Sequence, residues 1–347
     1  MDLHGGRRKF LREASMLLAG WGPMVSRAEG RPERQRVIVA VAGQTSLQYL
    51  PLTIARRLGY FTAAGIDIEL LDLANGMRAQ RAVLEGAADV ACGGFDDLLA
   101  LHEGRHQMQT FVQLARAPQV AFGVSHRTLP GYRRVGDLQG RRIAVMASGS
   151  AADLLVAVVL ARSGLALRDV RLSEAPGVGS ALQAVREGQV DAMVHMEPVM
   201  TMLEQKGDVR IISDARTLKG AQEAFGGPMP ATCMFAPAAY LRSYPNTVQA
   251  VTDAIVHALK WLQTAGPSDL IKALPEPYLL GDRGLYLAAF GKVRESISPD
   301  GVMPEEAVRT ALRALAVRDA NFKPPRGEIE RMVANDFARK AKERFRA

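Results

Sequence analysis

Strand-like and helix-like segments alternate along most of this chain, and this alternation limits the possible folds more than any other feature. The run Val37–Ala42 is apolar throughout, which is typical of a strand that is buried on both faces of a sheet. A helical pattern follows at 50–61. The same order of strand, loop and helix returns after Asp137, beginning with a strand pattern at 141–145. This alternation predicts parallel sheets that are covered by helices on both faces.

A short internal repeat indicates that the chain contains two similar units. Residues 82–89 (AVLEGAAD) align with residues 184–191 (AVREGQVD) at an offset of 102. In each copy a helix is expected to end at a glycine, Gly86 or Gly188, just before a strand begins. A length of 347 residues also suits two lobes of ordinary size. We therefore expect two α/β lobes, with ligand-binding loops at the carboxyl ends of their strands.

Several short motifs follow one another in a fixed order. They are the loop at 43–49, LGYF at 58–61, GIDIE at 65–69, EGAAD at 85–89, DLQGRRIAV at 137–145 and EGQVD at 187–191. Their order and spacing resemble the nitrate/sulfonate/taurine class of ABC-transporter solute-binding proteins, the SsuA/THI5-like family. The resemblance extends from Val37 to about Phe337. It implies a type II periplasmic-binding-protein fold, in which two doubly wound α/β lobes are joined by a two-segment hinge with a ligand cleft between them.

The resemblance also implies how the chain is divided between the lobes. The two crossovers are expected near 113–124 and 226–235. Lobe one would then comprise 36–118 and 232–347, and lobe two would comprise 119–231. Carriers of this class close around a small-molecule solute by hinge bending and present it to the membrane permease of an ABC importer.

The N-terminus predicts export. The basic stretch 6–12 (GRRKFLR) is followed by a short apolar run, Ala14–Val25, and by a small-x-small site that ends at Ala28. The paired arginines resemble a twin-arginine signal, although Gly6 stands where Ser or Thr is usual, so the general export route stays open. We expect residues 1–28 to form a signal peptide that is cleaved near Ala28, and the mature protein to be a periplasmic monomer.

Four loops, each after a strand and before a helix, are expected to form the ligand cleft. Backbone N–H groups and the positive ends of helix dipoles favour an anion at such loops, and serine hydroxyls add donors. The predicted solute is therefore a small organic anion such as a sulfonate or a carboxylate. The candidate residues are Gln44, Ser46, Leu47, Tyr49, Gly94, Phe95, Asp96, Arg116 and Thr232 in lobe one, and Ser148, Gly149, Ser150, His195 and Glu197 in lobe two.

Each of these candidates also has a purely structural interpretation. The serines can cap helices, Phe95 can pack in its loop, and Arg116 can be a surface residue. His195 and Glu197 can form a hydrogen-bonded pair behind the cleft. Two ionised carboxylates would repel a bare anion by ~1–4 kcal/mol each. We expect Asp96 to be a first-turn helix residue and Glu197 to hold a positive group, so that the anion also has an amine or amide donor.

Motifs of catalysis and of cofactor binding are not found in the sequence. There is no P-loop, HExxH or GxSxG motif, and the GVG at 177–179 is not followed by the third glycine of a dinucleotide site. Cys92 and Cys233 are the only cysteines, and their spacing does not suggest zinc. We therefore expect no enzymatic activity, no metal and no other cofactor.

The charge pattern does not favour nucleic acid as a partner. The formal charge of +8 is spread among acidic residues without an aromatic and basic stripe, so we expect no nucleic-acid partner.

Two questions stay open in the sequence. The resemblance places the strand ending at Cys92 beside the strand with Cys233, so both a bridge and two free thiols are possible. The alternative functions are a periplasmic ligand sensor partner and THI5-like binding or synthesis of a thiamine-pyrimidine precursor.

Overall fold

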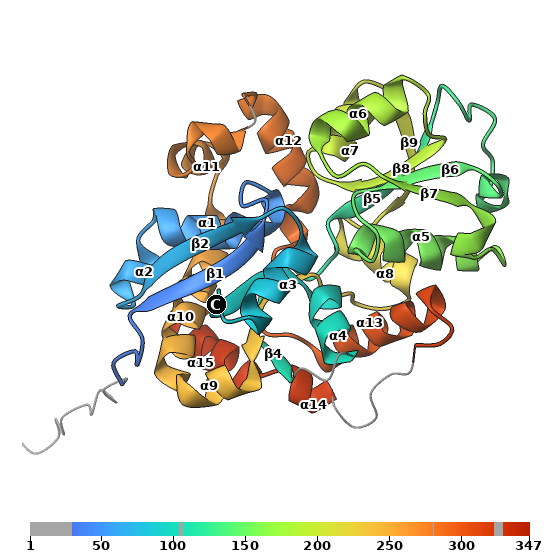
Figure 1. The fold of residues 1–347 in the computed structure, drawn as a ribbon. Coiled ribbons are helices and arrows are strands. Elements are labelled where there is room, and N and C mark those ends of the chain that lie inside the picture. The colour runs from blue at the N-terminus through green and yellow to red at the C-terminus, as the bar shows by residue number, and fades with distance from the viewer. Residues whose placement is uncertain (1–29, 104–106, 280, 323–328) are drawn as a thin grey trace, which may run out of the picture. The chain divides into compact units, whose positions relative to one another are not determined.

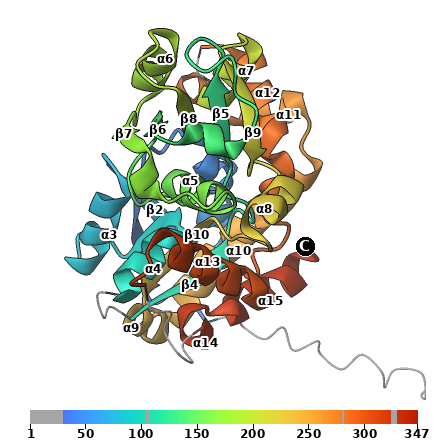
Figure 2. The same cartoon turned by 90° about the vertical axis from the view of Figure 1, so that its right-hand side faces the viewer.

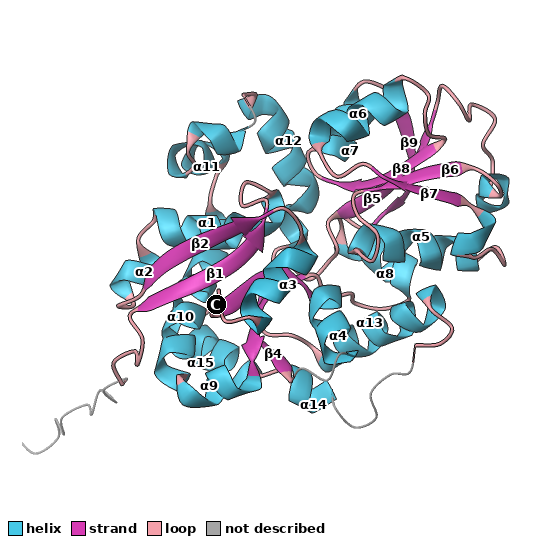
Figure 3. Ribbon diagram, in the orientation of Figure 1, coloured by secondary structure: helices cyan, strands magenta, loops and turns pink. Residues whose placement is uncertain are grey.

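The computed structural model contains two five-stranded sheets, each with helices packed on both of its faces (Figure 1, Figure 3). Residues 32–347 form one compact unit, and lobe one and lobe two denote its parts around the first and the second sheet. The expected signal peptide at 1–28 lies outside the residues that the structure describes. These are 30–103, 107–279, 281–322 and 329–347.

The sheet of lobe one has the strand order β2-β1-β3-β10-β4. β1 is parallel to β2 and β3, whereas β10 is antiparallel to β3 and β4. Val37, Val39 and Val41 are fully buried, in agreement with the apolar run that predicts this strand. The strands are β1 (Arg36–Ala42), β2 (Asp67–Leu73), β3 (Val90–Gly94), β4 (Met108–Gln113) and β10 (Thr232–Pro237).

The sheet of lobe two repeats this topology in the order β7-β6-β8-β5-β9, with β5 antiparallel to both of its neighbours. The predicted parallel pairing therefore holds for β2-β1-β3 and for β7-β6-β8, whereas β10 and β5 are antiparallel to their neighbours. β5 and β10 each enter their sheet from the other lobe, so they run against the strands that arrive through helical crossovers within one lobe. The strands are β5 (Val120–Ser125), β6 (Arg142–Val145), β7 (Arg171–Glu174), β8 (Ala192–Met196) and β9 (Val209–Asp214).

The chain passes between the sheets twice. The first crossing, 114–119, joins β4 to β5, and the second crossing, 226–231, leads into β10. A third segment runs beside them, because Ala115 and Ile297 form an isolated antiparallel bridge. Gln119 Nε2 also donates to Ser296 Oγ over 2.8 Å, which fastens this segment to the first crossing.

Helices from the C-terminal part of lobe one contact lobe two, α12 against α7 and α13 against α5 and α8 (Figure 1, Figure 2). In the described part of the chain, no helix combines the length and apolar character that a bilayer crossing requires. Lobe two contains α5 (Ala151–Ala161), α6 (Val178–Arg186), α7 (Val199–Gln205) and α8 (Leu218–Phe225). Lobe one contains α1 (Leu50–Arg57), α2 (Tyr60–Ala63), α3 (Gly76–Leu84), α4 (Phe95–Glu103), α9 (Ala238–Ser243), α10 (Pro245–Thr264), α11 (Pro267–Ala273), α12 (Arg283–Val293), α13 (Glu305–Arg318), α14 (Ile329–Met332) and α15 (Asn335–Phe345).

The internal repeat corresponds to equivalent positions in the two lobes. Its copies form the α3–β3 joint in lobe one and the α6–β8 joint in lobe two. The aspartate that ends each copy accepts a hydrogen bond from the neighbouring strand, β1 in lobe one and β6 in lobe two. Ile38 N donates to Asp89 over 2.9 Å, and Arg142 N donates to Asp191 over 3.0 Å. The repeat therefore anchors the start of β3 to β1 and the start of β8 to β6.

The two cysteines lie on neighbouring strands, as the resemblance implies, and both are free and buried. Cys92 pairs with Met234 in the β3–β10 ladder, whereas Cys233 pairs with Gly93. Directly paired residues point to the same face of a sheet and successive residues point to opposite faces. Cys92 and Cys233 consequently belong to the cores on opposite faces of the sheet, where no bridge can join them.

Candidate functional site

The four predicted cleft loops lie at the carboxyl ends of β1, β3, β6 and β8, two in each lobe. As predicted from the sequence, they contain residues 44–49, 93–96, 148–151 and 195–198. Two of them touch across the lobes, because Ser46 Oγ lies 3.9 Å from Met196 Sδ at the end of β8. The structure therefore places the first loop of lobe one against the last loop of lobe two.

In lobe one, the backbone amides of these loops already have carboxylate partners. Gly43 N donates to Asp72 Oδ1 over 2.8 Å, and Gln44 N contacts the same oxygen at 3.2 Å. Gly94 N donates to Asp97 Oδ2 over 3.1 Å. The donors that were expected to face an anion are thus bonded to side chains of the same lobe.

Lobe two shows the same arrangement. Ser148 N donates to Glu174 Oε1 over 2.8 Å, and hydrogen bonds from Ser148 lower the pKa of that carboxyl. Gly149 N donates to Asp153 Oδ2 over 3.0 Å. The other oxygen of this buried carboxylate, Oδ1, has no hydrogen-bond partner among the described residues. Asp153 Oδ1 is therefore an unpaired acceptor that is enclosed beside the loop.

Asp96 lies in the first turn of α4, as expected for an acidic residue at a helix N-terminus. Burial and the neighbouring charge of Asp97 raise the pKa of Asp96 to about 7, while the charge of Arg318 acts in the opposite direction. The carboxylate folds back over Gly94, where an added Cβ would lie 2.2 Å from Asp96 Oδ1. A side chain at position 94 would therefore require the Asp96 carboxylate to move.

Arg318 connects the two lobes at this place, and sequence reasoning missed it. Its Nη1 donates to the carbonyl oxygen of Gly149 over 3.2 Å, from the last residue of α13 to the loop before α5. Its charge also acts on Asp96. Because Arg318 is separated from both loops by more than 160 residues, no local pattern indicates this position.

Glu197 differs from its expected role. Its carboxylate is 4% exposed, with Oε1 accepting from Arg216 Nη1 over 2.6 Å and Oε2 accepting from Thr201 N over 3.0 Å. Arg216 is fully buried and is also bound by Asp214. A buried guanidinium requires carboxylate partners, and this requirement directs Glu197 into lobe two and away from a solute.

His195 is also held within lobe two. Its Nδ1 lies 3.3 Å from the carbonyl oxygen of Met196, and its Nε2 lies 3.2 Å from that of Ala175. Burial lowers the pKa of this imidazole, although both contacts oppose the shift. The neutral imidazole of His195 therefore lies between two backbone carbonyls and can donate to one of them, whereas Glu197 bonds to Arg216.

The remaining candidates fall into three groups. Leu47, Tyr49, Phe95 and Thr232 are buried, and Tyr49 Oη accepts from Ala42 N over 3.2 Å. Arg116 lies beside the crossings and outside the four loops. The residues with exposed or half-buried side chains or backbone in the loops are Gln44, Ser46, Gly94, Asp96, Ser148, Gly149 and Ser150.

Residues 46–266 match the NMT1/THI5 like family. The chain belongs to this family. A solved structure from Bordetella bronchiseptica RB50 is 43% identical, covers 92% of this chain and 100% of that chain, and has a TM-score of 0.85.

Two solved structures with lower identity share the fold of this NMT1/THI5-like chain. The alkanesulfonate-binding protein SsuA from Xanthomonas axonopodis pv. citri, bound to MOPS, is 19% identical over 87% of this chain and 99% of that chain, with a TM-score of 0.67. The periplasmic nitrate-binding protein NrtA from Synechocystis PCC 6803 is 13% identical over 91% of this chain and 90% of that chain, also with a TM-score of 0.67. These matches confirm the periplasmic-binding-protein fold and the predicted resemblance.

Proposed function

We propose that this chain is the solute-binding component of an ABC importer in the periplasm and delivers a small organic solute to a membrane permease without covalent chemistry. Four loops at the carboxyl ends of strands, two from each lobe, support this proposal, as does the contact between Ser46 and Met196. The names of the two lower-identity relatives, an alkanesulfonate-binding and a nitrate-binding protein, agree with it.

The solute in this proposal is an organic anion that also has an amine or amide donor. The observation behind it is that carboxylates of the chain already accept hydrogen bonds from amides in the cleft loops, in both lobes. A bare anion would meet occupied donors and several negative charges. The free oxygen of Asp153 and the half-buried carboxylate of Asp96 can accept from a solute amine.

The acidic end of such a solute requires a positive or donating partner. Arg318 provides a guanidinium next to Gly149, and Ser46 provides a hydroxyl whose contact is a weak one to sulfur. Both groups belong to lobe one, whereas Asp153 belongs to lobe two, so a solute that bonds to these groups and to Asp153 would bridge the lobes and favour closure. The further proposed contacts are Gln44, Gly94, Ser148 and Ser150.

Matched pairs of solutes test this function. Taurine should stabilise the mature protein against heat more than ethanesulfonate does, and β-alanine more than propanoate, because only the amino members can bond to Asp153 and Asp96. A solute at 100 times its dissociation constant adds about 2.7 kcal/mol to the free energy of unfolding. Asp153→Asn should reduce the preference for the amino member.

Two outcomes would contradict the proposal at different levels. Equal stabilisation by taurine and ethanesulfonate would remove the amine requirement and leave the binding function intact. Normal solute uptake in cells that lack this protein, measured with radiolabelled solute, would contradict the role in import.

A further inference from the structure

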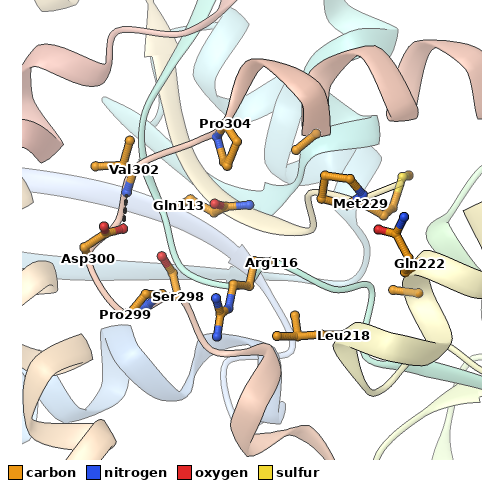
Figure 4. Close-up of a pocket in the computed structure, with 13 residues that line it drawn as sticks. Gln113, Arg116, Leu218, Gln222, Met229, Ser298, Pro299, Asp300, Val302 and Pro304 are labelled. Carbon is orange, nitrogen blue, oxygen red and sulfur yellow. Dashed lines mark hydrogen bonds between the residues drawn. The ribbon is translucent and has the colours of Figure 1, made fainter. Parts of the chain in front are cut away.

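A cavity lies beside the two crossings between the lobes, away from the four predicted cleft loops. Its volume is about 360 Å³, within the range of small-molecule sites. Its walls come from both crossings, from α8 in lobe two and from residues 298–307 in lobe one (Figure 4). None of the residues lining it belongs to a cleft loop.

Two buried donors in this cavity have no acceptor. Gln113 is 1% exposed, and its Nε2 has no hydrogen-bond partner among the described residues. Arg116 Nε is likewise buried without a partner, although Nη2 of the same guanidinium donates to the carbonyl oxygen of Glu295 over 3.3 Å. An unsatisfied buried donor costs ~1–3 kcal/mol, so such groups usually have a partner. Both side chains line the cavity in Figure 4. The two unpaired nitrogens are themselves enclosed, so each side chain must rotate to reach an acceptor inside the cavity.

The charge in the cavity favours an anion. No ion pair to Arg116 is found within the described part of the chain. The acidic residue in the lining, Asp300, accepts from Val302 N over 3.1 Å and pairs with Lys342 Nζ at 2.8 Å. Its charge is thus compensated, whereas the charge of Arg116 is not. A carboxylate next to Arg116 would make charge-assisted hydrogen bonds.

The rest of the lining is mostly apolar. Leu218 and Ala221 face the cavity from α8, Met229 from the second crossing, and Pro304 and Ala307 from the start of α13 (Figure 4). A simple inorganic ion would leave these surfaces without contact. An apolar group attached to the anion would cover them and gain ~25 cal/mol for each Å² removed from water.

We propose that this cavity is a second binding site, which takes a small organic carboxylate with its acidic group on Arg116 and Gln113 and its apolar part against Met229 and Pro304. The site is independent of the cleft, because the two share no lining residue. It therefore does not rest on the proposed import function.

Benzoate is a suitable probe, with benzamide as its neutral counterpart of nearly equal shape. In titration calorimetry on the mature protein, benzoate should bind at least 10-fold more tightly than benzamide. Arg116→Gln should weaken benzoate binding at least 10-fold, and Arg116→Lys should weaken it less because the charge is kept. Asp153→Asn, in the cleft, should leave benzoate affinity unchanged. Anomalous scattering from 4-bromobenzoate in crystals should locate the bromine between Met229 and Pro304.

The Gln113→Met variant tests whether Gln113 binds the ligand or stabilises the fold. If the amide has no internal partner, this apolar replacement of similar size leaves the melting temperature of the unliganded protein unchanged or higher, while benzoate affinity falls several-fold. Gln222→Trp, at an exposed lining position, should block entry without disturbing the core.

Three results would overturn the proposal. The first is bromine density in the cleft alone. The second is the same benzoate affinity in the wild type and in both the Arg116→Gln and Gln222→Trp variants. The third is a Gln113→Met variant with a lower melting temperature and unchanged benzoate affinity. The cleft experiments with taurine use other residues, so either proposal can fail while the other stands.

Discussion

At the scale of single residues, the acidic side chains of the cleft loops have two different roles. Glu197 belongs to a buried ion-pair network in which Arg216 also contacts Asp214 at 2.7 Å and Glu204 at 3.3 Å. Asp96, in contrast, is half-buried, and the negative charge of Asp97 beside it raises the pKa of its carboxyl. The first carboxylate is bonded within lobe two, and the second is the one that we propose as a contact of the solute.

Glu197→Gln should destabilise the protein and leave solute affinity unchanged. Removing one partner of a buried pair leaves an uncompensated charge and typically costs ~3–5 kcal/mol. Asp214 still contacts Arg216, so we expect about 3 kcal/mol, measured by urea unfolding. Glu204→Gln is the matched control and should cost less than about 1 kcal/mol, because that carboxylate is one-third exposed. Weaker solute binding by folded Glu197→Gln would contradict the structural role.

Asp96 should make solute binding depend on pH. Its raised pKa of about 7 means that the carboxyl becomes protonated as pH falls through 7, and a neutral carboxyl attracts an amine poorly. Affinity for taurine should therefore fall between pH 8 and pH 6. The same shift makes the folded state bind more protons than the unfolded state between about pH 4 and 7, so this group lowers stability as pH rises through that range. Asp96→Asn should abolish both effects, whereas the exposed Asp67→Asn should keep them.

At the scale of elements, the two copies of the helix–glycine–strand joint differ in one measurable respect. Gly86 and Gly188 both have positive φ, +76° and +75°, which other residues adopt only with strain. An added Cβ at Gly86 would meet nothing within 4 Å, whereas at Gly188 it would lie 3.2 Å from Thr128 Cγ2. The joints thus have the same backbone conformation and different surroundings.

Alanine substitution at both glycines separates strain from crowding. Gly86→Ala should lower the free energy of unfolding by about 1 kcal/mol through backbone strain alone. Gly188→Ala should cost more, because Thr128 must also move. Chemical denaturation of the two variants measures the difference. Equal losses would mean that Thr128 adjusts freely.

At the scale of the whole molecule, the C-terminal part of the chain completes the candidate site. Arg318, at the end of α13 in lobe one, reaches the Gly149 loop of lobe two, and α13 packs on α5. A solute whose acidic group bonds to Arg318 would contact a lobe-one side chain that is itself bonded to lobe two.

Arg318→Ala should weaken taurine binding about 10-fold, because one charge-assisted hydrogen bond contributes ~1.5–3 kcal/mol. Arg309→Ala is the control on the same helix, since Arg309 is exposed and pairs only with Glu305 among the described residues. Titration calorimetry distinguishes the two variants. Unchanged affinity of Arg318→Ala would exclude Arg318 from the solute site.

Much of the fold follows from local patterns in the sequence. The apolar run Val37–Ala42 predicts β1, and the helical pattern at 50–61 predicts the segment that α1 and α2 occupy, because burial and helix starts depend on nearby residues. The repeat at 82–89 and 184–191 predicts two related lobes. The four cleft loops are also predicted, since strand ends and helix starts locate them.

What only the tertiary structure decides is which partner each side chain meets. The antiparallel entry of β5 and β10, the bond between Glu197 and Arg216 and the reach of Arg318 to Gly149 all join segments whose relation no local pattern shows. The chemistry of the site depends on these contacts. The sequence predicts loop amides that face a solute, and in the fold these amides donate to carboxylates of the chain. Sequence periodicity therefore determines the elements and their order, and long-range packing determines which donors and charges remain for a solute.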